Sequence, residues 1–115
     1  MTNYLPGSTH RQVVSEASIN ATVIKDSVGQ IVYLQARNDS RLVRHLKFYD
    51  KATPPDPATD KPIQVISLFP QAGPAMMVGA INFKAGIALT ITAGIEDTDT
   101  GATAADDVIV KMNVL

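Results

Sequence analysis

The chain has no cysteine and no tryptophan, and it is poor in other aromatic residues. Without cysteine it can form neither a disulfide framework nor a metal site built on thiolates. Three phenylalanines and three tyrosines in 115 residues argue against a carbohydrate- or receptor-binding module, because such modules usually stack sugars on exposed aromatic rings. No apolar run approaches the roughly 18 to 20 residues of a membrane span, and the N-terminal region has no apolar segment of the signal-peptide kind. We therefore expect no membrane partner.

A surplus of positive charge is also lacking. The formal net charge is −1, whereas nucleic-acid-binding proteins normally carry a basic surplus. Arg37, Arg41, Arg44 and Lys47 could form a local basic cluster, but recognition of single-stranded nucleic acid would add exposed aromatics among them. We therefore expect no nucleic-acid partner. Residues 1–51 hold seven basic and four acidic residues, and residues 52–115 hold three and seven. This asymmetry fits either a mixed solvated surface or complementary patches that orient subunits in an assembly.

Strand-like patterns are what the chain does contain. Apolar residues make up 45% of it. Within residues 42–49 one set of alternate positions is Leu42, Arg44, Leu46 and Phe48 and the other is Val43, His45, Lys47 and Tyr49, the period of two of a strand with one buried face. Similar segments recur between turn signals spaced about eight to twelve residues apart. We expect about seven strands, over residues 19–25, 30–37, 42–49, 63–69, 76–83, 87–93 and 107–114. The proline-rich segment 53–62 and the acidic segment 94–106 are expected to be loops.

This spacing predicts an all-β fold, an antiparallel β-sandwich or jelly-roll-like domain over residues 19–115. Residues 1–18 alternate poorly, so we expect them to form an extended N-terminal arm outside the sheets. The residues expected to fill the core are Ile31, Leu34, Leu46, Phe48, Val65, Phe83, Leu89, Ile91, Val108 and Val110.

No catalytic or cofactor-binding group is recognisable in the sequence. The acidic segment from Glu96 to Asp107 has the Asp-x-Asp spacing of some cation loops, but it lacks the remaining ligands of an EF-hand. Its aspartates are therefore expected to bond their own backbone. His10 and His45 are isolated, no serine lies in a G-x-S-x-G elbow, and no glycine-rich phosphate loop occurs. We expect no enzyme activity, no metal, no cofactor and no small-molecule substrate.

The candidate functional residues are therefore interface residues. Residues 1–18 are expected to dock onto another subunit, because an arm without structure of its own is ordered only when another surface offsets its conformational entropy. Met76 and Met77 are either core residues or part of a subunit contact. The interface candidates are Tyr4, Leu5, His10, Arg11, Arg41, Arg44, Met76 and Met77.

Several segments of the chain resemble a known group of proteins. These are residues 44–52 (RHLKFYDKA), the proline-rich loop after them, the strand at 63–69, residues 81–90 (INFKAGIALT) and the later Asp97-Thr98-Asp99. They resemble small proteins encoded among the structural genes of tailed phages and prophages, whose pattern is a "YLKLYD" strand, an "F..GLA" segment and a late "D.D" loop. The resemblance covers about residues 19–114. Phe48 stands where the pattern more often has an aliphatic residue, and Ile87 replaces its leucine.

The resemblance implies a structural protein of the virion, made in the host cytoplasm. The resemblance does not say which part of the virion this is; we expect a capsid decoration protein that stabilises the head by binding across subunit boundaries. The implied partners are further copies of the chain, as a homo-oligomer and most often a trimer, and the major capsid protein. A tail or neck component, or a carbohydrate- or receptor-binding β-sandwich module, is the alternative.

Overall fold

The fold is all-β. The computed structural model describes residues 7–115, the side chain of Val78 excepted, and these residues form eight strands and no helix. The strands are β1 (Thr9–Val14), β2 (Thr22–Lys25), β3 (Gly29–Asn38), β4 (Arg44–Asp50), β5 (Gln64–Leu68), β6 (Ala75–Phe83), β7 (Ile87–Thr92) and β8 (Val108–Val114). They make two four-stranded antiparallel sheets, which confirms the prediction at this level.

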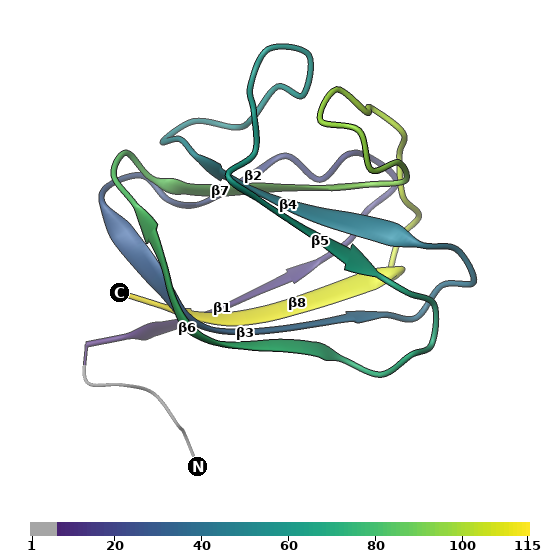
Figure 1. Ribbon diagram of the computed structural model, residues 1–115, viewed down its shortest axis with the longest axis horizontal. Coiled ribbons are helices and arrows are strands. Elements are labelled where there is room, and N and C mark those ends of the chain that lie inside the picture. The colour runs from purple at the N-terminus through teal and green to yellow at the C-terminus, as the bar shows by residue number, and fades with distance from the viewer. Residues whose placement is uncertain (1–6) are drawn as a thin grey trace.

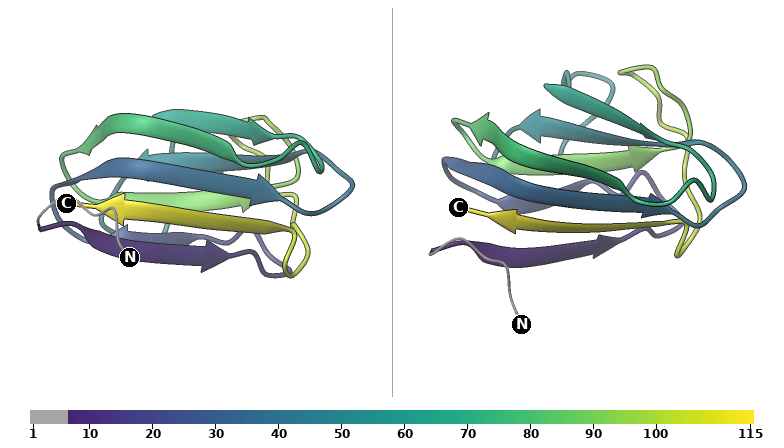
Figure 2. Two further views of the ribbon diagram at one scale, coloured as in Figure 1. Left: turned by 90° about the horizontal axis from the view of Figure 1, so that it is seen from below. Right: turned by 60° about the horizontal axis from the view of Figure 1, so that its bottom comes forward.

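The two sheets face each other in a sandwich-like arrangement (Figures 1 and 2). Sheet A has the order β1-β8-β3-β6 and sheet B the order β2-β7-β4-β5. Each strand of the first half of the chain pairs with its counterpart from the second half: β1 with β8, β2 with β7, β3 with β6 and β4 with β5. The chain therefore behaves like one long hairpin that wraps into two sheets.

The core lies between the sheets and consists of apolar side chains from alternate strand positions. The rings of Phe48 from sheet B and Phe83 from sheet A pack edge to face, with 6.4 Å between their centroids, a favourable geometry for aromatic pairs. Of the predicted core residues, all except Val65 are buried. Val65 is half-buried beside Lys47, while Ile66 pairs with Leu46 and packs against the core. A shift of one residue changes the face of a strand, and the prediction chose the wrong one here.

The expectation that residues 1–18 lie outside the sheets is wrong for Thr9–Val14. These residues form β1, which pairs with β8 from Thr9↔Val114 to Val14↔Ile109. Because β1 is an edge strand and its first four residues are exposed, burial imposes no alternation on its sequence. This strand brings the observed number to eight. Tyr4 and Leu5 lie outside the described residues, so the prediction of a docking arm there stays a prediction.

Strands β4 and β7 are buried on both faces, not on one as the alternation suggested. Two loops, over residues 51–63 and 93–107, rise over the outer face of sheet B (Figure 1). Beneath them, Lys47, Thr90 and Thr92 are fully buried, and Tyr49 is 1% exposed. The sheet therefore carries a polar layer between its outer face and these loops.

Candidate functional site

The polar layer on sheet B is the first place where groups capable of chemistry gather. Lys47 donates from Nζ to the carbonyl oxygen of Glu96 at 2.5 Å. Burial lowers the pKa of Lys47, and the nearby carboxylate of Asp99 partly opposes that shift. The Tyr49 hydroxyl lies 3.2 Å from Oγ1 of Thr90, and burial raises the pKa of this phenol. Both side chains are thus engaged inside the protein.

His45 lies in the same layer, with Nδ1 2.9 Å from Oγ of Ser67. Burial is the main cause that lowers the pKa of His45, and the positive charge of Lys47 adds to it. The environment therefore favours a neutral imidazole.

The acidic loop above this layer is held together by Asp99. Its Oδ1 accepts hydrogen bonds from the backbone N–H groups of Gly94 at 3.1 Å and Gly101 at 2.7 Å. A Cβ on Gly94 would lie 2.1 Å from Oδ2 of Asp99, so a larger residue here would displace the Asp99 carboxylate. The Asp99 carboxylate, which the Asp-x-Asp spacing suggested as a cation ligand, thus stabilises its own loop. Within residues 7–115, no three His, Asp or Glu side chains converge closely enough to hold a metal ion.

Asp50 has a similar role at the turn between β6 and β7. Its carboxylate accepts hydrogen bonds from the backbone N–H groups of Ala85 at 2.8 Å, Lys84 at 3.0 Å and Gly86 at 3.3 Å. These bonds lower the pKa of Asp50, Ala85 contributing most. A Cβ on Gly86 would lie 2.6 Å from the carbonyl oxygen of Lys51. The side chain and the glycine together fix the turn.

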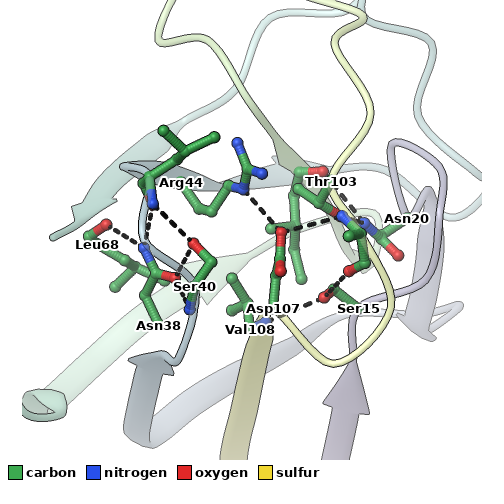
Figure 3. Close-up of polar contacts among 12 residues, drawn as sticks. Ser15, Asn20, Asn38, Ser40, Arg44, Leu68, Thr103, Asp107 and Val108 are labelled. Carbon is green, nitrogen blue, oxygen red and sulfur yellow. Dashed lines mark hydrogen bonds and ion pairs between the residues drawn. The ribbon is translucent and has the colours of Figure 1, made fainter. Parts of the chain in front are cut away.

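A second polar cluster joins the strand ends on one side of the molecule (Figure 3). Arg44 and Asp107 form an ion pair at 3.0 Å, with both side chains largely buried. The same Asp107 oxygen accepts the backbone N–H of Ala104 at 3.0 Å. Asn38 donates to the carbonyl oxygens of Leu42 at 2.7 Å and Leu68 at 2.8 Å, and so ties the β3–β4 turn to β5.

Asn20 and Ser15 complete this cluster. Asn20, whose φ is +60°, donates to Oγ1 of Thr103 at 2.8 Å and to the carbonyl oxygen of Ile91 at 3.2 Å. Ser15 donates to the carbonyl oxygen of Ala104 at 2.8 Å and accepts the N–H of Val108 at 3.0 Å. These buried bonds fasten the segment after β1 to the segment before β8.

The structure does not bring the predicted interface residues together. His10 and Arg11 are exposed on β1, and Nδ1 of His10 lies 3.2 Å from Oδ1 of Asn113. Arg41 is exposed in the β3–β4 turn, whereas Arg44 is buried in its ion pair with Asp107. The two methionines lie on the opposite edge of sheet A from β1: Met76 is 59% exposed and Met77 half-buried.

Sequence reasoning missed a surface that includes these methionines. Strands β5 and β6 are edge strands of different sheets, and Figure 1 looks onto the side that they share. We call this the β5–β6 side and define it as residues 63–83. No charged residue occurs in this segment, although 18% of the whole chain is charged. That uninterrupted run was the signal available in the sequence.

The β5–β6 side is also apolar and hollowed. Ile63, Phe69 and Met76 are 49%, 62% and 59% exposed. A hollow of about 220 Å³ opens between the two edges. Its surface is mostly apolar, and its lining residues are Leu34, Ala36, Ile66, Ala75, Met76 and Met77. A second hollow of about 210 Å³ adjoins it around Phe69 and Pro74.

Comparisons with known proteins give no relative: no protein-family model, curated protein or solved structure matches this chain. A separate observation is that no segment of residues 7–115 forms a helix of the length and apolarity that crossing a membrane requires.

Proposed function

We propose that the chain is a structural protein of a tailed-phage virion, a capsid decoration protein that acts through its interfaces and not through catalysis. The observation that carries the proposal is that the polar residues of the phage-like segments make their hydrogen bonds within the domain. Lys47, Tyr49, Asp50 and Asp99 all make hydrogen bonds within the fold. The polar residues that carry the resemblance therefore stabilise the fold. The proposed function then depends on contacts made by the surfaces of the domain.

The fold is proposed to be a jelly roll. The strand orders β1-β8-β3-β6 and β2-β7-β4-β5 support this, since wrapping one long hairpin into two four-stranded sheets gives these orders. Jelly rolls are used by viral capsid proteins and by lectins. A shared fold does not establish a shared function, but this one agrees with the virion role that the sequence resemblance implies.

The proposed partners are the major capsid protein and further copies of this chain, in a small oligomer for which a decoration role favours a trimer. The residues before β1, including Tyr4 and Leu5, are proposed to be the arm that docks on the capsid. His10 and Arg11, exposed on the free edge of β1, extend the same surface. A location in the tail or neck would use the same kind of contacts.

Cosedimentation with purified capsids of the phage or prophage that carries the gene tests this function. The full chain should bind in a saturable manner, and a chain without residues 2–6 should bind at least tenfold more weakly. Circular dichroism and the melting temperature should match in both, because β1 is retained. Deleting residues 1–18 is unsuitable, since it removes β1 and the buried Ser15.

Two results would contradict the proposal. Binding to tails but not to capsids would place the protein elsewhere in the virion. Equal capsid binding by the full and shortened chains would show that residues 2–6 are not the docking element.

A further inference from the structure

We infer that the β5–β6 side is the face through which two copies of this chain associate, with β6 of one copy against β6 of the other about a two-fold axis. The inference departs from the trimer favoured under the proposed function, because it specifies self-association as a two-fold dimer. It does not depend on where in a virion the protein lies. Three features of the face carry it: its charge, its free strand edges and its apolar hollow.

The absence of charge favours a second copy as the occupant. All 21 charged residues, 10 basic and 11 acidic, lie outside residues 63–83. In a two-fold contact the same patch is present on both partners, so any charge near the axis meets its own copy. Like charges placed together across an interface repel each other and weaken the contact. A face without charge can meet itself without this repulsion, and it offers nothing to attract a strongly charged partner.

The edges of the sheets point to the same face. Exposed edge strands are usually protected against pairing by charged residues, proline, bulges or short length. Of the four edge strands, β1 carries Arg11 and β2 is short and ends with Lys25. The strands β5 and β6 carry no charge and no proline, and β6 runs for nine residues. The two edges without a charged residue thus lie on one side of the molecule.

Strand β6 is protected only over its second half. Its pairing with β3 shifts register between Ile31 and Tyr33, and Gly79 has φ +132°. Before this bulge the pairing is regular, from Ala36↔Ala75 to Leu34↔Met77. Ala75 to Met77 are therefore the part of the free edge that is best suited to pair with a second strand.

The size and shape of the face suit such a contact. The molecule measures 36 × 33 × 19 Å, and Figure 1 looks onto the β5–β6 side along the shortest dimension. This is one of its broadest sides, with room for the roughly 800 Å² that each partner buries in a standard interface. The hollow of about 220 Å³ beside Met76 can receive an apolar side chain of the second copy, and the flexible methionines can adapt to it.

The test is the mass of the full chain in solution, by light scattering and sedimentation equilibrium, in the absence of any capsid. Wild type should form a dimer. Met76→Lys should weaken the dimer at least tenfold, because it places like charges beside the axis. Phe69→Lys serves as a second variant on the same face. Ile95→Lys is the matched control: Ile95 is also exposed, at 55%, but it lies on the loop over sheet B and should leave the dimer intact.

Mixing two variants tests whether the face meets itself. Met76→Lys and Met76→Glu should each be folded by circular dichroism and mainly monomeric, and the mixture should recover the dimer. The inference is overturned by a monomeric or trimeric wild type, by a dimer that Met76→Lys and Phe69→Lys leave intact, or by a mixture that stays monomeric. Failure of capsid binding would leave this result unaffected, so the two proposals can fail separately.

Discussion

Buried ionisable side chains are the unusual feature of this protein at the residue scale. Lys47 is fully buried, yet its described hydrogen bond is to a single backbone carbonyl. Removing a charge from water costs several kcal/mol unless partners compensate. Here the carboxylates of Asp99, Asp97 and Glu96 oppose the effect of burial on the lysine. The acidic loop therefore covers Lys47 and supplies negative charges that favour its protonated form.

The neighbouring His45 should make stability depend on pH. Its pKa in the folded protein lies below 6.5, the ordinary value, because burial and the charges of Lys47 and Arg44 disfavour the imidazolium, while Asp99 opposes them. The unfolded chain then binds more protons than the folded one below about pH 6.5, so stability falls as the pH drops through this range towards the folded pKa. We expect His45→Gln to flatten this part of the curve.

Urea denaturation of wild type and variants between about pH 8 and pH 5 measures the effect. His10→Gln removes an exposed histidine and is the matched control, which should follow wild type. Parallel curves for wild type and His45→Gln would show that His45 is not the group responsible.

The sequence predicted the inward-facing residues well because alternation is a local signal. It could not predict that His45, Lys47 and Tyr49 are buried, because alternation places them on the face of the strand opposite the core, which is expected to face solvent. The groups that cover them come from loops at residues 51–63 and 93–107, and no local pattern shows where such loops settle. The acidic loop was correctly expected to bond its own backbone.

At the scale of elements, the loop between β7 and β8 depends on one carboxylate. Asp99→Ala would leave the N–H groups of Gly94 and Gly101 without their acceptor and would remove a counter-charge of Lys47. We expect a loss of about 1–3 kcal/mol in the free energy of unfolding, because part-buried hydrogen bonds to a charged group are removed. Urea titration measures it. Asp97→Ala, at an exposed position, is the control: it removes a weaker counter-charge of Lys47 but neither of these two hydrogen bonds, so it should destabilise the protein less than Asp99→Ala.

The same loop should be indifferent to calcium. Asp99 already accepts two backbone hydrogen bonds through Oδ1, and a cation would compete with them. We expect the melting temperature to be the same with Ca²⁺ and with EDTA. A ligand that binds only the native state must stabilise it, so a rise of several degrees that EDTA reverses would establish a cation site.

At the scale of the whole molecule, the strand pairing follows a single rule that local patterns do not reveal. Seven of the strands could be located from alternation and turn signals. The eighth, β1, has an unusual position: it is added at the edge of sheet A by pairing with β8, about 100 residues away in the sequence. Because the first residues of β1 are exposed, the information that places the strand lies in its partner and not in its own pattern.

The position of β1 also has a mechanical consequence. Thr9 lies opposite Val114, and all six residues of β1 pair only with β8. A pull on Thr9 along the strand is resisted by the whole ladder at once, whereas a pull across it opens one residue pair at a time. Such peeling leaves the pairing of β8 with β3 intact, so it is a local opening and not unfolding of the domain. If the chain is anchored through the residues before Thr9, the response to force therefore depends on its direction. β1 resists a pull along the strand, and under a pull across the strand it detaches from β8 before the rest of the domain unfolds.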